Sequence, residues 1–515
     1  MPSSDDHHKL QTIGIVTAVA SSVIVPLLLK YHDRPLFYEH PEGIAYNSGY
    51  PVVGHLTSLL KNISRIHDYQ IDQYEKLGVL TFTFPVVGNP TTVNTIDPQN
   101  IEYFLKGNFK NYLKGPKFNS SLKELLGNGI FNANGENWKY QRKTASFIFN
   151  VKNFRDEFTD VFVKEIKIIC NDIFNKAVED KSIIDLQDIM FRFTLDSFVF
   201  LGFGVQLNSL LSKEKVPFAV SFDHMQRLGA RRFINPLQFL MEHLSSSLTP
   251  WKMSTKDHLH ILDSFAAEMI AKRRKEIADG VVGHKDLLSR FMNTTNDKGE
   301  KLNDTELRDT VLNFIIAGRD TTAQTLSWLF YNLMLHPRIE QKILEEIRDH
   351  ITDDIEHDPP KLYEAIDKMP YLHAVFYETL RLHPVVPANQ KYALEDDVWP
   401  DGTIIKAGYY VSWSPYAQGR CTKIWGQDAK EFYPERWIDE EGHLHRESPS
   451  KWPAFHVGPR VCLGQNLATL EALVCVAMLL KRYTFELVPG QIVTYEFSLT
   501  LPMKDGMKVY IKKRH

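Results

Sequence analysis

The spacing of apolar residues along the chain is that of helices over most of its length. Apolar positions recur every three or four residues in three long segments, 154–177, 259–277 and 304–335. Shorter runs rich in β-branched and aromatic residues predict strands near 79–84, 403–413 and 507–511. The pattern therefore predicts a mainly α protein with small β-sheets.

The clearest of these helices has recognisable ends. Asn303 and Glu306 have the spacing of a capping box, and the helix must stop near His336 because Pro337 follows. Such a helix would be about 45 to 50 Å long, enough to cross a domain. Its centre, residues 317–322, reads Ala-Gly-Arg-Asp-Thr-Thr, although a glycine there costs about 1 kcal/mol relative to alanine. The motif is either a packing contact with a surface ion pair or a functional feature.

A second apolar segment lies near the N-terminus. No charged residue occurs from Thr12 to Leu29, and as a helix this run would span about 27 Å, the thickness of a thin endoplasmic-reticulum bilayer. Lys30 and Arg34 follow it, whereas Asp5 and Asp6 stand before it. The positive-inside rule then places the rest of the chain in the cytosol. A cleaved signal peptide and a buried core helix are the competing interpretations.

These observations predict three regions. Residues 1–33 are expected to be a single-pass membrane anchor, and residues 34–55, rich in proline and glycine, a connector. Residues 56–515 contain no internal repeat and no low-complexity linker, so they are expected to form one large domain.

Composition narrows the function classes. Hydrophobic residues make up 43% and charged residues 24% of the chain, as in ordinary globular proteins. The net charge of -3, without a basic stripe, argues against nucleic acid as a partner. Four cysteines with no CxxC pair indicate a reducing compartment and no structural zinc.

One cysteine has an unusual context. Residues 455–464 read Phe-His-Val-Gly-Pro-Arg-Val-Cys-Leu-Gly, and an apolar helical run follows. At such a loop-to-helix junction, backbone N–H groups and the helix dipole would favour the thiolate of Cys462. Gly458 and Gly464 would permit tight turns and the close approach of a flat ligand, and Arg460 offers a cation for an acidic group.

This segment resembles the heme-binding signature of the cytochrome P-450 family, Phe-x-x-Gly-x-Arg-x-Cys-x-Gly, at every position. The resemblance implies the cytochrome P-450 fold and heme b as cofactor, with Cys462 as the axial thiolate ligand of its iron. Phe455, Gly458, Arg460 and Gly464 would surround that cofactor.

Three further motifs match the family in its order, so the resemblance covers nearly the whole chain after the predicted anchor. It implies that Glu378 and Arg381, three residues apart on a helix, form a buried structural pair completed by Arg436. The remaining residues that it assigns to heme binding are Trp138, Arg142 and Lys391. Lys391 stands where many members of the family carry arginine.

The centre of the long helix also matches a family motif, which implies catalytic roles for its residues. Gly318 would open space over the iron, while Asp320 and Thr321 would guide protons during oxygen activation. The reaction class implied is insertion of one oxygen atom of O2 into a C–H bond of a lipophilic small-molecule substrate. Because the chain has no GxGxxG fingerprint, its electrons are expected from a separate NADPH-cytochrome P-450 reductase.

Some segments look like the fatty-acid and alkane omega-hydroxylases of fungi and plants. They are residues 191–197, 221–223, 232–233, 317–322 and 386–393. This implies hydroxylation of long-chain fatty acids or alkanes, with Arg231 or Arg232 either meeting a substrate carboxylate or lying on the surface. A sterol, terpenoid or xenobiotic substrate is the alternative, and a non-catalytic heme carrier or sensor is a more remote one.

The expected location is the endoplasmic reticulum membrane, with the catalytic domain in the cytosol.

Overall fold

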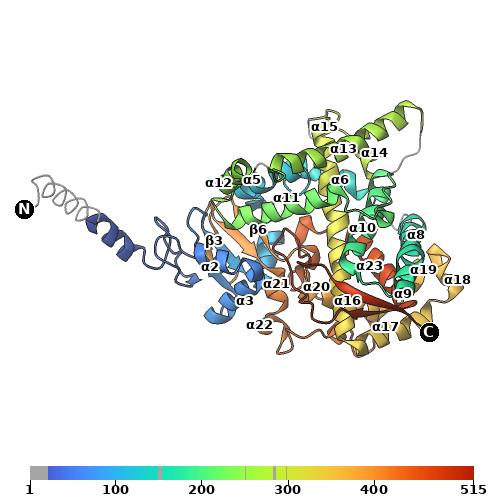
Figure 1. The fold of residues 1–515 in the computed structure, drawn as a ribbon. Helices are drawn as coiled ribbons and strands as arrows, with labels where there is room; N and C mark the ends of the chain where they lie inside the picture. The colour runs from blue at the N-terminus through green and yellow to red at the C-terminus, as the bar shows by residue number, and fades with distance from the viewer. Residues whose placement is uncertain (1–20, 149–153, 250, 282–285, 297, 515) are drawn as a thin grey trace, which may run out of the picture.

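The structure is a computed structural model that describes residues 21–148, 154–249, 251–281, 286–296 and 298–514. The described chain is mostly helical, with small sheets, as the apolar spacing predicts (Figure 1). Its α-helices are α2 (Leu56–Lys61), α3 (Ile66–Leu77), α4 (Pro98–Glu102), α5 (Gly115–Leu126), α6 (Gly135–Ser146), α8 (Thr159–Ile168), α9 (Asn175–Asp180), α10 (Leu186–Phe203), α11 (Pro217–Ile234), α12 (Gln238–Leu248), α13 (Thr255–Ala278), α14 (Leu287–Asn293), α15 (Asp304–Ile315), α16 (Thr321–Leu335), α17 (Pro337–His350), α18 (Asp353–Glu356), α19 (Pro359–Asp367), α20 (Pro370–Leu382), α21 (Pro415–Gly419), α22 (Thr422–Trp425) and α23 (Gln465–Leu480).

The strands form three sheets among the described residues. The largest has six strands in the order β1-β2-β3-β9-β6-β4. The others are the three-stranded sheet β10-β11-β5 and the pair β7-β8. The strands are β1 (Ala45–Tyr46), β2 (Thr81–Thr83), β3 (Thr92–Thr95), β4 (Tyr112–Leu113), β5 (Ile184–Asp185), β6 (Asn389–Ala393), β7 (Asp397–Val398), β8 (Ile404–Ile405), β9 (Tyr410–Trp413), β10 (Tyr483–Leu487) and β11 (Lys508–Lys513). The three strand segments expected from the sequence are thus present, although a turn divides 403–413 into β8 and β9.

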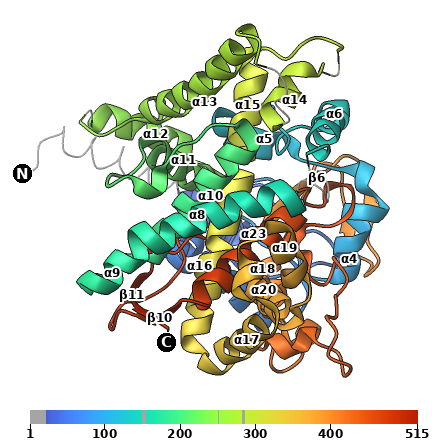
Figure 2. The same cartoon turned by 90° about the vertical axis from the view of Figure 1, so that its right-hand side faces the viewer.

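The long helix has the ends that the sequence predicts. Asn303 and Glu306 form the capping box of α15, and α16 ends at its cap residue His336, immediately before Pro337. The helix crosses the middle of the domain (Figure 2). Between α15 and α16, residues Ile316–Asp320 form a π-helical turn, η7. Such wide turns within α-helices occur frequently at functional sites.

Helix α23 lies at the centre of the helical region. Almost all of its side chains from Leu470 onward are buried, because it packs against α8, α16 and α20. A helix that is apolar on every face must be enclosed by other elements. The part of α23 from Leu470 to its end is therefore held in the core, and the heme-binding loop is attached to it.

The segment 34–55 is more ordered than the expected connector. Strand β1 pairs with β2, and the amide of His55 donates to the carbonyl of Pro85 at 2.9 Å. Gly54 has a φ of +60°, and a Cβ there would approach the Pro85 carbonyl oxygen to 2.4 Å. The folded body consequently begins before residue 56.

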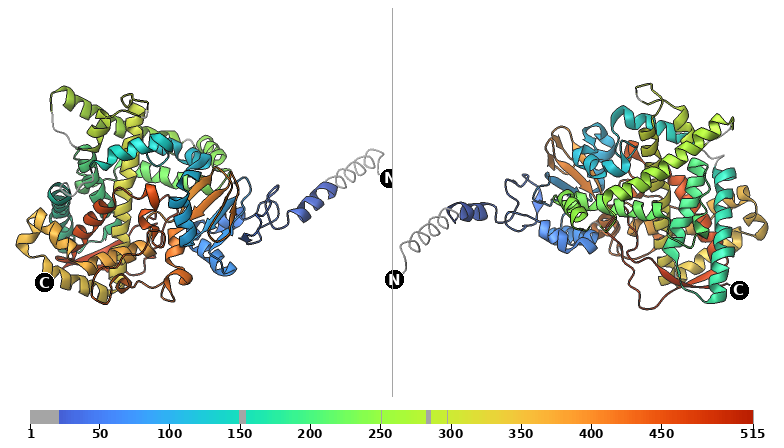
Figure 3. Two further views of the ribbon diagram at one scale, coloured as in Figure 1. Left: turned by 180° about the vertical axis from the view of Figure 1, so that it is seen from behind. Right: turned by 45° about the horizontal axis from the view of Figure 1, so that its top comes forward.

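The predicted anchor lies largely outside the described residues. Residues 21–30 are helical and mostly exposed, and they extend from the side of the body where the six-stranded sheet lies (Figures 1 and 3). None of the helices in the described part of the chain is both long enough and apolar enough to cross a membrane.

Candidate active site

A cavity of about 550 Å³ lies between the centre of the long helix and the loop that precedes α23. Helices α5 and α6 and strands of the six-stranded sheet complete its wall. Most of the lining is apolar and includes Phe118, Leu122, Phe198, Phe314, Ile316 and Leu380. Cys462 lines this cavity and is accessible from it, although protein surrounds it on all other sides. Apolar pockets with a few converging polar groups are typical of sites for small lipophilic molecules.

The surroundings of Cys462 differ from the sequence expectation in one respect. Its amide donates to the Phe455 carbonyl at 2.9 Å, which closes the loop. Burial raises the pKa of the Cys462 thiol, and the backbone of Gly464 and the charge of Arg142 oppose this effect only in part. Without a bound metal ion, burial therefore outweighs the backbone and charge effects that favour the thiolate. A metal ion deprotonates a coordinating thiol, so the thiolate depends on the iron.

The glycines of the motif have different environments. Gly458 has a φ of +69°, and a Cβ there would lie 2.2 Å from the Leu105 carbonyl oxygen. Its requirement for glycine thus comes from the tight turn and from the neighbouring π-helical segment Tyr103–Gly107, and Gly458 itself is not among the residues that line the cavity. Gly464 and Phe455 do line it, and a Cβ at Gly464 would make only ordinary contact with the Cys462 sulfur at 3.9 Å.

Four cations gather at one edge of the cavity. Lys114, Arg142 and Arg460 line the cavity there, and Lys391 lies behind the wall next to Lys114 and Arg460. Arg460 lies over the ring of Trp138 at 4.6 Å, and its terminal nitrogen donates to the Ala133 carbonyl at 2.7 Å. Lys391 is fully buried in β6, and its ammonium has no hydrogen-bond partner. The Nε atom of Arg460 also lacks one.

This cluster has no compensating negative charge. Among the described residues that line the cavity, Glu471 is the sole acid, and no cation of the cluster forms an ion pair within the described chain. Burial and mutual repulsion lower the pKa of Lys114 to about 7 and that of Lys391 well below its usual value. Buried cations without counter-charges are costly unless an anion joins them. The cluster therefore fits the two carboxylates of heme b. It contains Arg142, Lys391 and Arg460 of the sequence analysis, and the ring of Trp138 lies against Arg460.

Lys114 was missed by the sequence analysis. It stands just before α5, far along the chain from the heme-binding motif, and no local pattern distinguishes it from a surface lysine. His456 also faces this cluster, packed edge-on against Trp413 at 5.4 Å. Burial and the charges of Lys391, Lys114 and Arg460 lower its pKa far below the usual value, so it stays neutral.

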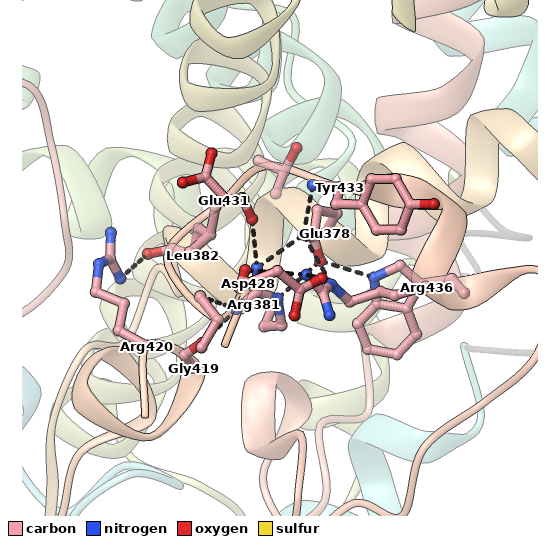
Figure 4. A network of polar contacts seen from close by, with 12 residues as sticks. Glu378, Arg381, Leu382, Gly419, Arg420, Asp428, Glu431, Tyr433 and Arg436 are labelled. Atoms are coloured by element: carbon pink, nitrogen blue, oxygen red, sulfur yellow. Dashed lines mark hydrogen bonds and ion pairs between the residues drawn. The ribbon is translucent and has the colours of Figure 1, made fainter. Parts of the chain in front are cut away.

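The structural pair expected at Glu378 and Arg381 is present and extends into a network (Figure 4). Both side chains are fully buried, with a Glu378–Arg381 distance of 2.7 Å, and Arg436 joins Glu378 at 3.0 Å. Arg381 also donates to the backbone carbonyls of Gly419, Ala429 and Glu431. The carboxylate oxygens of Glu378 accept further hydrogen bonds from the Tyr433 amide and the Trp437 indole. Because every charge is matched, this network holds α20 to the segment before the heme-binding loop.

Gly318 lies in the cavity wall, but the space beside it is filled. A Cβ at this position would come within 1.9 Å of the ring of Phe198 from α10. The glycine is therefore needed for the close packing of Phe198 against η7. The structure thus does not show the open space that the sequence analysis expected from this residue.

Asp320 and Thr321 face different surroundings. Thr321 lines the cavity and donates to the Ala317 carbonyl at 2.7 Å. Asp320 is buried outside the cavity wall, where it accepts from Arg319 at 2.7 Å and from Gln226 at 3.1 Å. Burial raises the pKa of Asp320 to about 7, since the charge of Arg319 opposes it only partly.

The carboxyl of Asp320 reaches the cavity indirectly. The amide of Gln226 links it to the Thr500 hydroxyl, which lies 3.5 Å from the Gln226 oxygen and lines the cavity. The acid and alcohol predicted from the motif are therefore neighbours in sequence but not a hydrogen-bonded pair.

Glu471 is a second residue that the sequence analysis missed. It lies on α23, is buried in the cavity wall, and has one carboxyl oxygen without a hydrogen-bond partner. Burial raises its pKa well above the usual value, so the carboxyl is protonated at neutral pH. Its position two helical turns after Cys462 could have drawn attention to it, but an acid in an apolar helical run carries no specific signal.

Comparison with known proteins agrees with this geometry. A family model described as Cytochrome P450 matches residues 45–506. The chain is 36% identical over 501 residues to Cytochrome P450 704B1 of Arabidopsis thaliana, covering 90% of this chain and 94% of that protein. It is 37% identical to Cytochrome P450 704C1 of Pinus taeda, covering 90% and 92% of the two chains. Cytochrome P450 monooxygenase cyp1 of Mycosarcoma maydis is 33% identical, over 94% of this chain and 77% of its own length.

The site is thus that of a heme-thiolate enzyme. The protein belongs to the cytochrome P450 monooxygenase family. Members of this family use heme iron with an axial cysteine thiolate, together with O2, a redox partner and lipophilic substrates.

Proposed function

We propose that this protein is a membrane-anchored monooxygenase that hydroxylates long-chain fatty acids or alkanes at or near the terminal methyl group. The observation that supports this most directly is the apolar cavity in which Cys462 faces the long helix, with an uncompensated cation cluster at its edge. The choice of substrate rests on the sequence segments that look like omega-hydroxylases and on the apolar lining. A sterol, terpenoid or xenobiotic would fit an apolar cavity as well.

Cys462 is the proposed iron ligand, and Lys114, Arg142, Lys391 and Arg460 are the proposed partners of the heme carboxylates. Heme with a cysteine ligand supplies the oxidising chemistry: O2, two electrons and two protons convert a C–H bond to C–OH and release water. The apolar wall binds and orients the substrate and excludes water from it.

The protons would come through the chain's own polar groups. Thr321 holds a hydroxyl at the cavity wall, and Asp320, whose pKa lies near 7, retains or releases a proton near neutral pH. Gln226 and Thr500 connect this carboxyl with the cavity.

Membrane attachment is the second part of the proposal. The helix of residues 21–30 exposes Val23, Ile24, Val25, Leu28 and Leu29. Helix α12 exposes Phe239, Leu240, Met241, Leu244 and Leu248, and it lies on the side from which residues 21–30 extend (Figures 1 and 3). Large exposed apolar patches mark interaction surfaces.

Fractionation tests the membrane anchor. We expect the full chain to sediment with endoplasmic-reticulum membranes and to remain there after carbonate extraction. Its C-terminus should be accessible to protease from the cytosolic side. Release of the protein by carbonate would contradict the anchor.

The enzyme class is tested by the spectrum of the reduced protein with carbon monoxide. The wild type should show the red-shifted Soret band of a thiolate ligand, and Cys462→His should lose it. Titration of the same preparation with long-chain fatty acids should change the Soret band. A thiolate band that does not respond to fatty acids or alkanes would support the heme-thiolate enzyme class but reject fatty acids and alkanes as substrates.

The role of Thr321 is tested by coupling. Thr321→Ala should bind heme normally, because the hydroxyl bonds only to the Ala317 carbonyl of its own helix. It should consume NADPH but release a larger fraction of the electrons as hydrogen peroxide. Thr325→Ala is the matched control, since Thr325 makes the same kind of bond to the Thr321 carbonyl one turn later. Unchanged peroxide release in Thr321→Ala would reject the proton-relay role.

A further inference from the structure

Lys117 places a positive charge on the cavity wall without a matching negative charge. It belongs to α5 and lines the same cavity as Cys462. Its ammonium donates one hydrogen bond, to the Phe233 carbonyl at 2.8 Å, and no carboxylate of the described residues lies within ion-pair distance. An ammonium has three donors, so two are left for a ligand.

This lysine is separate from the cation cluster at the heme edge. Lys114, three residues earlier, lies over the ring of Phe118 at 4.0 Å, and the charge of Arg460 contributes to its lowered pKa. Lys117 turns instead toward the end of α11, and burial alone lowers its pKa, to about 8. It therefore remains largely charged at neutral pH. The cavity thus has two cationic positions, of which the four-residue cluster suffices for the carboxylates of heme.

The surroundings of Lys117 indicate the shape of its ligand. Phe118, Phe233 and Ile234 line the cavity beside it, and Asn89 adds one polar group. The backbone of Lys117 is fixed, because its amide donates to the Tyr410 hydroxyl at 2.8 Å. A cation held at the wall of an apolar cavity suits an amphiphile that carries one anionic group and a long hydrocarbon chain.

We propose that Lys117 is the carboxylate-binding residue of the substrate site, and that the substrate is a long-chain monocarboxylic acid whose hydrocarbon chain lies in the cavity that Cys462 lines. This inference rests on the proposed monooxygenase function and selects fatty acids over alkanes. It also predicts the regiochemistry, since a carboxylate held at Lys117 leaves the hydrocarbon end of the chain for oxidation.

The arginines that the sequence analysis considered for this role do not fit it. Arg232 is buried outside the cavity, where it pairs with Glu242 at 2.5 Å and with Glu124 at 2.7 Å. Its charge is therefore already matched. Arg231 is exposed and does not line the cavity.

A purely structural role for Lys117 makes a different prediction. Phe233 lies in the last turn of α11, where lysine side chains commonly satisfy free carbonyls. Loss of such a cap would disturb the cavity for every ligand alike. A carboxylate-binding role affects only ligands that carry the negative charge.

The experiment compares tetradecanoic acid with methyl tetradecanoate, which has the same chain but no charge. Binding of both to the heme-loaded full chain is followed by the change of the Soret band in the wild type, Lys117→Met, Lys117→Arg and Lys123→Met. Lys123 is an exposed lysine on the same helix and controls for the loss of one charge. The carbon monoxide spectrum of each variant verifies that the site is intact.

We expect Lys117→Met to bind the acid about 10- to 100-fold more weakly, the effect of losing a charge-assisted hydrogen bond. Its affinity for the ester should change less than threefold, and hydroxylation of the acid should spread to positions further from the terminal methyl. Lys117→Arg should retain most of the affinity for the acid, and Lys123→Met all of it.

Two results would overturn the proposal, and they are distinguishable. Equal losses for acid and ester in Lys117→Met, with wild-type binding of both, would reject the carboxylate site and leave the monooxygenase function standing. No response of the wild type to the acid, with a response to the ester or an alkane, would reject fatty acids as substrates and the role of Lys117 with them.

Discussion

Two groups of buried charges in this protein have opposite electrostatic character. In the network of Glu378, Arg381 and Arg436, each charge has an opposite charge or a carbonyl within hydrogen-bond distance. In the cluster around Arg460, the ammonium of Lys391 faces the Phe109 ring at 5.9 Å but has no hydrogen-bond partner among the described residues. Both groups lie close to the heme-binding loop in the fold, yet the first is complete within the protein and the second is not.

The difference separates structure from ligand binding. A buried charge that is fully paired contributes to holding elements together, and removing its partner is costly. A buried charge that lacks a partner destabilises the folded protein until a ligand supplies one. The incompleteness of the second group therefore identifies it as an anion site, and the same argument leads to Lys117.

The largest expected effect is that of Glu378→Ala. It leaves Arg381 buried without its counter-charge, while Arg436 keeps its ion pair with Asp428 at 2.9 Å, and the loss should cost about 3 to 5 kcal/mol of unfolding free energy. Urea unfolding of the protein, with and without added heme, measures this loss. Retention of wild-type stability would show that the backbone carbonyls alone satisfy Arg381.

Lys391→Met should produce effects of opposite sign on the protein and on its cofactor. Without heme the variant should be as stable as the wild type or more stable by about 1 kcal/mol, because a methionine suits the buried site better than an unpaired ammonium. With heme, transfer of the cofactor to excess apomyoglobin should be about 10-fold faster or more. Lys406→Met, which removes an exposed lysine paired with Asp396, is the control. An unaltered rate of heme transfer in Lys391→Met would show that Lys391 does not bind the heme carboxylates.

The pH dependence of stability should differ between the heme-free and heme-loaded forms. The pKa of Lys114 is lowered to about 7 by burial and by Arg460, and that of Lys391 is lowered further by Lys114 and Arg460. The unfolded chain therefore binds more protons than the folded one above pH 7, so heme-free stability should rise from pH 7 to about 10. The carboxylates of heme should restore both pKa values and flatten this rise. Equal slopes in both forms, measured by urea unfolding, would argue against contact between heme and these lysines.

The smallest effect is expected at an exposed pair. Lys430 and Glu75 lie 2.7 Å apart, but each side chain is 55% exposed. Lys430→Gln should change the unfolding free energy by less than about 1 kcal/mol, because water already solvates both charges. A loss comparable with that of Glu378→Ala would mean that burial is not what distinguishes the two groups.

Local features of the fold were predictable from the sequence. The capping box at Asn303 and the proline after His336 set the ends of the long helix through contacts within a few residues. The π-helical turn at Ile316–Asp320 was not predictable in the same way. It depends on α10, whose Thr194 hydroxyl donates to the Arg319 carbonyl and whose Phe198 ring fills the space beside Gly318.

The candidate site shows the same division. The motif around Cys462 is contiguous, so its residues could be named in advance, whereas the contacts of Gly458 with Leu105 and of Asp320 with Gln226 come from segments far along the chain. Arg232 could not be judged from sequence either, since the glutamates that neutralise it come from α5 and α12.

By itself, the sequence determined the mainly helical fold, the family and the position of the cysteine, because these depend on apolar periodicity, capping and a contiguous motif. Only the tertiary structure decided which charges are satisfied. Lys114 and Lys117 are ordinary lysines in the sequence, and Lys391 was singled out only by the family resemblance. All three acquire their electrostatic character from burial and from the absence of a carboxylate near them among the described residues. The electrostatic free energy of a side chain depends on every group within several ångströms in space, and the chain brings those groups together only when it folds.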